Sequence, residues 1–329
     1  MSKLPLTVAM PDYDHARDLV TGVVRPDGID LTCLIMAVEE IFYRFLVYKE
    51  WDVSEISMAK YCALIAQGDK NFLALPVFPS RVFRQGSLYV RRNGPVKTVK
   101  DLVGKRVGLP EWAQTAAVYS RGFLEHEYGI KLSSIEWVQA GVNQPGRVEK
   151  VELKLPKGIK LTRMPDKSLN DMLLSGEVDA IMVARAPAAF TAGDRKICRL
   201  FENFLEVEAQ YYRKTGIFPI MHAVAVKREV LDKNPWVARS LFNAFEEAKR
   251  RSIARATDST VTMFPIPWCY EYARRGAELL GEDYFPYGIE QNRKTLEAFL
   301  SYAHEQGVCE RLVKVEELFP KQLTSTYRV

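Results

Sequence analysis

Apolar, strand-like runs alternate with helical segments in residues 4–78, and this alternation limits the possible folds more than any other feature. Residues 4–10 and 29–35 have the composition of strands, and residues 38–48 carry apolar side chains at helical spacing. Residues 72–78 form a nearly continuous apolar run, which is typical of a buried strand. The alternation predicts an α/β protein with a mainly parallel sheet and helices on both of its faces.

A polar turn at residues 91–95 interrupts the pattern, and a second α/β pattern begins with the strand 106–109. The strand 217–227 leads the chain back toward the first unit. Two crossovers of this kind leave a cleft between two lobes, where a small ligand binds. We therefore predict lobe 1 from residues 1–93 and 221–329, and lobe 2 from residues 94–220.

The charge and composition exclude several classes of function. The 46 Lys and Arg against 41 Asp and Glu give a net charge of +5, and the basic residues are spread along the chain. Nucleic-acid binding is disfavoured because it needs a concentrated basic face. There is no apolar run of about 18 residues and no secretory pattern near the N-terminus, so we expect a cytoplasmic protein without a membrane partner. A homo-oligomer is left open.

Sequence motifs for cofactors and metals are absent. There is no phosphate-binding loop, no GxGxxG after a strand, no GxSxG and no HExxH. The four histidines are not spaced as metal ligands, and the five cysteines are far apart and predicted to be reduced thiols. We therefore predict neither a metal nor a cofactor.

Arginines follow two of the predicted strands. Arg81 and Arg84 come directly after the most apolar strand, and Arg185 follows the strand near residues 179–183. Ligands of open α/β sheets bind at the carboxyl ends of strands, and the planar guanidinium group suits a carboxylate. The alternative is that these arginines are solvated or paired with acidic residues.

A second candidate group lies between a predicted strand and a predicted helix. Glu111 stands beside Trp112, and a carboxyl next to an indole in a cleft would have a raised pKa and act as a general acid. Alternatively, Glu111 is an ordinary carboxylate favoured by the helix dipole. Thr115, with the free amides of the first helical turn, is a candidate for anion binding, and Trp112 is a candidate for contact with the substrate.

The remaining candidates are His222 and three polar residues at strand ends. His222 lies in an apolar strand at the predicted return crossover, and imidazole suits proton transfer near neutral pH. A histidine satisfied within the core is the equally weighted alternative. His15, Arg17 and Ser57 follow strands and could contact a ligand, although helix starts look the same.

Several segments, in order along roughly the whole chain, resemble the 4,5-dihydroxyphthalate decarboxylase family. The most specific is Ala-Leu-Pro-Val-Phe-Pro-Ser-Arg-Val-Phe-Arg at residues 74–84. Residues 101–111, 176–180 and 219–222 extend the resemblance, and the first two of these have patterns found across type II periplasmic-binding-protein folds. The chain departs from the family pattern with Trp112, where a tyrosine is common, and with Gln85 in place of histidine.

The resemblance implies a two-lobed, type II periplasmic-binding-protein-like fold and a reaction without a cofactor. That reaction is the non-oxidative conversion of 4,5-dihydroxyphthalate to protocatechuate and CO2. Under this hypothesis Arg81, Arg84 and Arg185 hold carboxylate, while His222 and Glu111 move protons.

Two other functions fit the same fold. A solute-binding protein would capture a small carboxylate between the lobes without changing it, but the absence of an export signal favours the enzyme. An enzyme of pyrimidine or thiamine-precursor synthesis would need a phosphate-binding or reactive-histidine signature, and the sequence has none.

Overall fold

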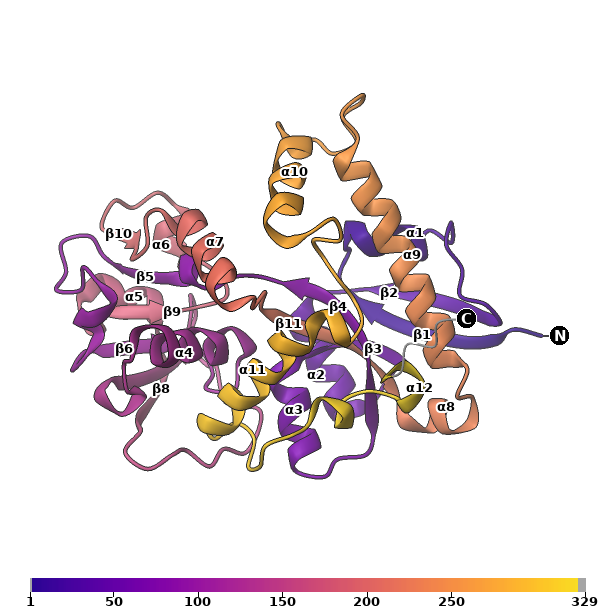
Figure 1. Cartoon of the computed structure of the whole chain (residues 1–329). Coiled ribbons are helices and arrows are strands. Elements are labelled where there is room, and N and C mark those ends of the chain that lie inside the picture. The colour runs from indigo at the N-terminus through magenta and orange to yellow at the C-terminus, as the bar shows by residue number, and fades with distance from the viewer. Residues whose placement is uncertain (1, 325–329) are drawn as a thin grey trace.

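Two mixed β-sheets, side by side, organise the computed structural model, which describes residues 2–324. Figure 1 shows sheet A on the right and sheet B on the left. Sheet A has the order β2 (Ile29–Ile35), β1 (Leu4–Met10), β3 (Val53–Ser57), β11 (Ile220–Lys227) and β4 (Phe72–Arg81). Sheet B has the order β10 (Ile197–Arg199), β5 (Leu88–Arg91), β9 (Ala180–Met182), β6 (Arg106–Leu109), β7 (Glu136–Gly141) and β8 (Lys160–Ser168).

The predicted α/β class with mainly parallel sheets is confirmed, and each sheet contains one antiparallel strand. In sheet A, β1 runs parallel to β2 and β3, but β11 enters between β3 and β4 antiparallel to both. In sheet B, β5 is antiparallel to β9 and β10. The antiparallel strands are β5 and β11, the first strands that the chain forms after each change of lobe, and sequence periodicity does not reveal the direction of a strand.

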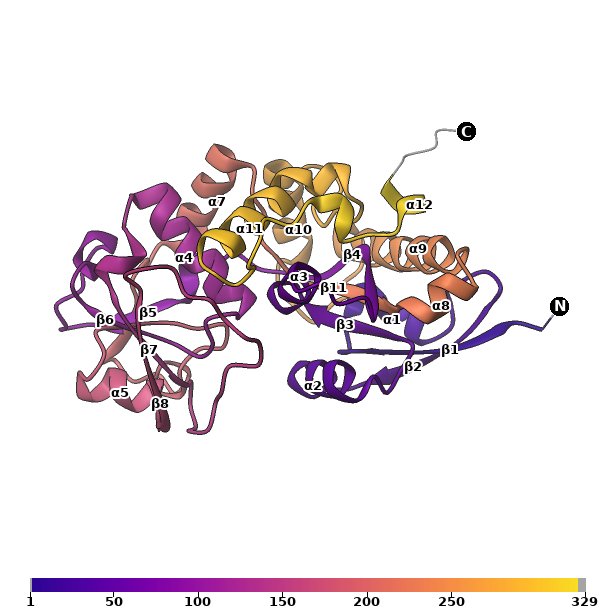
Figure 2. The same cartoon turned by 90° about the horizontal axis from the view of Figure 1, so that it is seen from below.

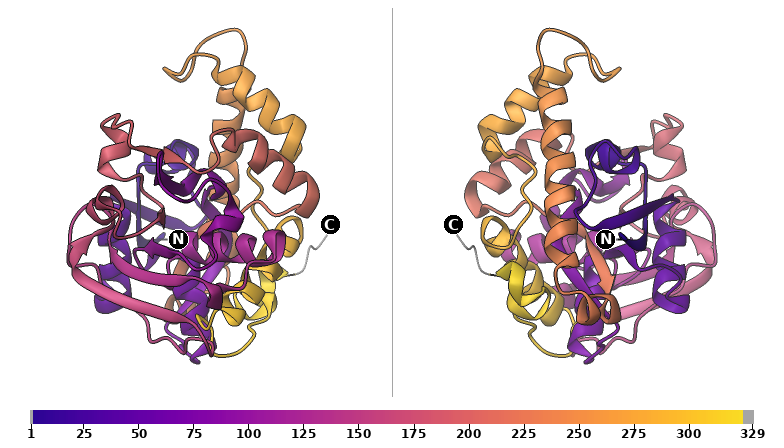
Figure 3. Two further views of the ribbon diagram at one scale, coloured as in Figure 1. Left: turned by 90° about the vertical axis from the view of Figure 1, so that its left-hand side faces the viewer. Right: turned by 90° about the vertical axis from the view of Figure 1, so that its right-hand side faces the viewer.

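Helices pack around both sheets and at the junction between the lobes (Figure 2). In the first half of the chain they are α1 (Arg17–Val20), α2 (Val38–Tyr48), α3 (Met58–Ala66), α4 (Thr115–Tyr128) and α5 (Leu169–Ser175). In the second half they are α6 (Ala188–Thr191), α7 (Phe204–Thr215), α8 (Arg228–Lys233), α9 (Val237–Thr257), α10 (Cys269–Leu280), α11 (Arg293–Glu305) and α12 (Lys321–Thr324). The antiparallel pair α9 and α10 projects from lobe 1 (Figure 3).

The predicted lobe boundary at residue 93 is wrong by one strand. Residues 88–91, which we assigned to lobe 1, form β5 and pair with β9 and β10 in sheet B. The polar turn at residues 91–95 therefore follows a strand of lobe 2 and does not mark the crossover. The chain changes sheets between the end of β4 and the start of β5.

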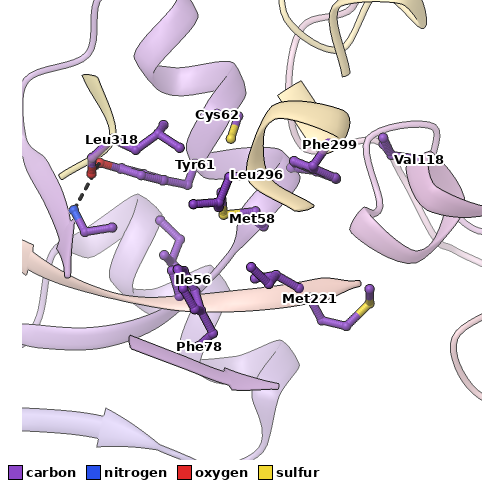
Figure 4. Close-up of a cluster of buried hydrophobic side chains, with 14 of the residues drawn as sticks. Ile56, Met58, Tyr61, Cys62, Phe78, Val118, Met221, Leu296, Phe299 and Leu318 are labelled. Carbon is purple, nitrogen blue, oxygen red and sulfur yellow. Dashed lines mark hydrogen bonds between the residues drawn. The ribbon is translucent and has the colours of Figure 1, made fainter. Parts of the chain in front are cut away.

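The core of lobe 1 continues into lobe 2 through α11. Figure 4 shows Met58 of α3, Phe299 of α11 and Val118 of α4 in one buried cluster, and α11 contacts both α3 and α4. At the α4–α11 contact, a Cβ on Gly122 would lie 2.4 Å from the ring of Tyr302, so only glycine allows this approach. The lobes are thus joined by packing as well as by the two crossovers.

None of the helices in residues 2–324 has the length and apolar character that crossing a lipid bilayer requires.

Candidate functional site

A cavity of about 390 Å³ lies between the lobes and is lined from both of them. Lobe 1 contributes residues of α2, the β3–α3 junction and β11, and lobe 2 contributes the segments that follow β6, β7 and β9. Five of the lining side chains are cations, namely Lys60, Arg84, Arg147, Lys150 and Arg185, and two are carboxylates, namely Glu39 and Glu111. This excess of positive charge suits an anionic ligand with more than one carboxylate.

The backbone of β11 brings His222 to this cavity. The pairing of β11 with β4 shifts register on both sides of His222, and such a bulge re-aims side chains. As a result, the consecutive residues Met221 and His222 both line the cavity. The Nδ1 atom of His222 lies 2.5 Å from Oε1 of the buried Glu55, and the ring of Phe42 packs edge-on at 4.9 Å. Nδ1 is therefore engaged, and Nε2 is the ring nitrogen left for a ligand.

Glu111 is the centre of a buried ion cluster. Its Oε2 accepts a 2.7 Å hydrogen bond from the ammonium of Lys60, and its Oε1 accepts a 2.6 Å bond from Nε of Arg147. Although burial opposes it, the charges of Lys60 and Arg147 lower the pKa of Glu111 below its ordinary value. The predicted raised pKa is therefore wrong, because the nearby indole does not govern this carboxyl and the cations do.

Replacing Glu111 with glutamine is expected to destabilise the protein. The change leaves the buried ammonium of Lys60 without its carboxylate, which costs about 3–5 kcal/mol of unfolding free energy near neutral pH. Since the folded-state pKa is lowered, this contribution is complete above the unfolded value of about 4.3 and disappears as pH falls through the folded value. Urea unfolding at neutral and acid pH measures the difference.

The matched control is Glu177→Gln, which removes the solvent-accessible ion pair with Lys167 and should cost no more than about 1 kcal/mol. Equal losses of stability in the two variants would contradict the central role of Glu111.

Arg84, a predicted carboxylate ligand, lines the cavity, and its guanidinium is almost fully buried. Its Nε contacts the sulfur of Met221 at 3.2 Å, and among residues 2–324 no carboxylate forms an ion pair with it. Burial lowers the pKa of Arg84 to about 10, so the group remains charged at neutral pH. A buried cation without a carboxylate partner is ready to accept one from a ligand.

Arg81, which we predicted to contact the ligand, does not line this cavity, because its guanidinium is bound to backbone carbonyls at the return crossover. Its Nη1 and Nη2 atoms donate to the carbonyls of Pro286 and Phe218 at 2.9 Å, and the group stacks on the Phe218 ring at 4.5 Å. Arg81 is the last residue of β4, whereas Arg84 lies beyond the strand, so the two arginines take different directions. Arg81 therefore joins the return crossover to the C-terminal part of lobe 1.

Three further predicted ligand contacts also lie outside the cavity lining. Trp112 is fully buried, donates to the carbonyl of Gln306 at 2.8 Å and packs against Trp137 in lobe 2. His15 lies between the rings of Tyr13 and Phe285, and burial lowers its pKa. Arg17 is exposed at the start of α1. The prediction rested on their position next to a strand end, which brings the backbone to the sheet edge near the cavity. It does not bring these side chains into the cavity lining.

Three further candidates, Ser57, Thr115 and Arg185, line the cavity and make contacts between its two walls. The hydroxyls of Ser57 and Thr115 are 3.0 Å apart, and Thr115 Oγ1 also accepts from the amide of Ala59 at 3.0 Å. At the mouth, Arg185 of lobe 2 pairs with Glu39 of α2 at 3.1 Å, and its side chain is 74% exposed. The contact between Ser57 and Thr115 is buried, whereas the ion pair between Arg185 and Glu39 is exposed to solvent.

Sequence reasoning missed Lys60, Arg147, Lys150, Tyr13 and Glu55. Two of them carried a usable signal, because Lys60 is the one charged residue in the apolar helix α3 and Glu55 interrupts the fully buried strand β3. A charge in such a segment needs a partner or a function. Arg147 and Lys150 lie in the irregular stretch after β7, where no hydrophobic periodicity indicates which way a side chain points.

One group in residues 2–324 has the donor types of a metal site, but it lies outside the cavity. Glu125, His126 and Glu305 place one ligand atom each within 4.8 Å of one another, where α4 meets α11. His126 and Glu305 already pair at 2.7 Å and are solvent-accessible, so this group has no feature that requires an ion.

A second hollow, of about 430 Å³, lies between α9 and α10 and is lined by residues 255–270. It contains few charged groups, so the inter-lobe cavity is the candidate site.

Two α/β lobes with a charged cavity between them define the class of periplasmic-binding-protein-like folds. The aliphatic sulphonate binding protein SsuA of Escherichia coli has a TM-score of 0.55 at 15% identity, over 98% of this chain and 99% of that chain. The alkanesulfonate-binding protein SsuA of Xanthomonas axonopodis pv. citri has a TM-score of 0.53 at 12% identity, over 97% and 99%. These likenesses establish the fold.

Sequence comparison gives the family. The chain is 36% identical over 330 aligned positions, the full length of both chains, to the 4,5-dihydroxyphthalate decarboxylase of Comamonas testosteroni. It is 40% identical over 214 residues to the protein of that name from Pseudomonas putida, covering 65% of this chain and 83% of the relative. No family model matches the chain. The chain belongs to the 4,5-dihydroxyphthalate decarboxylase family.

Proposed function

We propose that this chain is a cytoplasmic carboxy-lyase that converts 4,5-dihydroxyphthalate to protocatechuate and CO2 in the cavity between its lobes. Membership of the family supports the reaction. The observation that carries the assignment to this cavity is His222, held by Glu55 through Nδ1, in one enclosure with a surplus of cations. A proton-transfer group and an anion-binding wall are the two requirements of the reaction.

The chemistry needs three proton movements and no external oxidant. The hydroxyl para to the leaving carboxylate loses its proton, and the ring carbon that bears this carboxylate gains one. The resulting dienone breaks its bond to the carboxylate carbon, CO2 leaves, and the electron pair restores the aromatic ring while the phenol is reprotonated. Each turnover therefore takes up one proton, and we assign its delivery to the ring of His222.

The binding assignment follows from burial and charge. Arg84 holds the retained carboxylate, since its buried guanidinium forms no ion pair among the described residues. The ammonium groups near Glu111 draw the dianion into the cavity, and burial lowers the pKa of Lys150 in this cluster. Phe42 and Met221, beside His222, provide an apolar surface where neutral CO2 forms. Glu111, which the cations hold ionised, organises the cluster and is not assigned as the acid.

The test is CO2 release from 4,5-dihydroxyphthalate by the purified full chain. We expect equimolar CO2 and protocatechuate without added metal or cofactor. Phthalate is the matched control: it has the two carboxylates but no hydroxyl to supply electrons, so it should bind competitively and release no CO2. Binding of 4,5-dihydroxyphthalate without CO2 would contradict the proposal and favour the solute-binding alternative.

A further inference from the structure

A buried hydrogen-bonded chain lies behind His222, on the side away from the cavity. The Tyr13 hydroxyl donates to Oε1 of Glu55 at 2.7 Å, and Nδ1 of His222 lies 2.5 Å from the same oxygen. Glu55 is fully buried in β3, and Tyr13 follows β1, the neighbouring strand. Tyr13 and Glu55 do not line the cavity, so they reach the ligand only through His222.

Strand pairing explains why Glu55 and His222 meet. His222 of β11 is directly opposite Ser57 of β3. Glu55 is two residues before Ser57 and therefore on the same face of the sheet, so it is the diagonal neighbour of His222. The contact is built into the sheet and does not depend on a loop.

Both donors use one oxygen of the carboxylate. The other oxygen, Oε2, is buried and has no hydrogen-bond partner in residues 2–324. Tyr13 and His222 therefore share the negative charge on Oε1, and a stronger bond to one weakens the bond to the other. Burial, together with the Glu55 carboxylate, raises the pKa of Tyr13 above its ordinary value, so this hydroxyl stays a donor at all working pH values.

The other charged groups around His222 come from both lobes. Lys60 of α3, Arg84 beyond β4, Arg147 and Lys150 after β7, and Arg185 after β9 are the cations of the same cavity, and Glu39 of α2 and Glu111 are its carboxylates. Among the described residues Glu55 is the one carboxylate in hydrogen-bond contact with the imidazole. Substitution of Glu55 should therefore reveal the effect of this carboxylate on the imidazole separately from the effects of the other charged groups.

We propose that Glu55 and Tyr13 are positioning residues that set the proton affinity of His222 in opposite directions. The Glu55 carboxylate stabilises the imidazolium form, and the Tyr13 hydroxyl weakens this effect by drawing charge from the shared oxygen. The consequence for catalysis rests on the proposed function, whereas the effect on the ring is independent of it.

The experiment is titration of the histidine Cε1 resonances by NMR in the unmodified chain and two variants. Four histidines in the whole sequence make the spectrum assignable, with the His222→Gln spectrum identifying the relevant signal. In Glu55→Gln we expect the titration midpoint of His222 to fall by about one pH unit or more. In Tyr13→Phe we expect it to rise by up to about one unit. The controls Glu40→Gln and Tyr43→Phe, both exposed on α2, should leave it unchanged.

The pH dependence of kcat/KM for CO2 release gives the second readout. The part of this pH profile that reports the ionisation of His222 should shift to lower pH in Glu55→Gln and to higher pH in Tyr13→Phe. This holds whether the ring acts as acid or base. Opposite movements of the midpoint in the NMR titration support the proposal even if no CO2 is released, in which case only the proposed function fails. Movement in the same direction, or no movement in either variant, overturns it.

Discussion

Replacing His222 with glutamine is expected to lower kcat for CO2 release by about 10²–10⁴-fold, the usual contribution of a positioned acid or base. Glutamine keeps a polar group beside Glu55 but cannot take up and deliver a proton at neutral pH. KM should change little, because the cations that we propose as the substrate-binding groups remain in place. Steady-state kinetics with 4,5-dihydroxyphthalate measures both constants.

The matched control is His126→Gln, which alters a solvent-accessible histidine paired with Glu305 outside the cavity. It should leave kcat unchanged. A His222→Gln enzyme with most of its turnover would remove this residue from the proton-transfer role and leave its position in the cavity without a catalytic explanation.

Replacing Arg84 with methionine is expected to raise KM strongly. Loss of one partner of a buried charge pair costs about 2–5 kcal/mol, which corresponds to roughly 30-fold to several thousandfold in affinity. The variant should fold, since methionine suits the apolar contact that the arginine makes with Met221. Arg84→Lys should be intermediate, because it keeps the charge but loses the planar pair of donors. Inhibition by phthalate gives an independent measure of affinity.

Arg81→Met provides the comparison, because the two arginines are three residues apart and equally buried. Loss of the bonds from Arg81 to Phe218 and Pro286 should lower the free energy of unfolding, with little effect on KM. If the two variants changed KM alike, the separation of a ligand-binding Arg84 from a structural Arg81 would be wrong.

The fold was largely accessible from the sequence, and the antiparallel strand in each sheet was not. The sequence pattern located β1, β2, α2 and β6 at their observed bounds. It missed β8, whose side chains are mostly exposed and polar, and the short strands β5 and β10. Alternation within one strand says nothing about its neighbours, so the antiparallel insertion of β11 could not be foreseen.

The site was predicted in part, because strand ends indicate a sheet edge but not the direction of each side chain. Arg84 and His222 reach the cavity, whereas Arg81 and Trp112 turn into packed regions. The pKa of Glu111 was predicted in the wrong direction, since its partner Lys60 lies 51 positions earlier in the chain. Contacts over such separations depend on tertiary structure.

Under the proposed function, the surplus of cations around the cavity has a consequence for product release. The substrate, 4,5-dihydroxyphthalate, carries two carboxylates, whereas the product, protocatechuate, carries one. The other carboxylate leaves as uncharged CO2. The attraction that gathers the reactant is therefore weaker for what is made from it. The reaction therefore weakens the electrostatic attraction between the cavity and its ligand, and this favours dissociation of the aromatic product without a further conformational step.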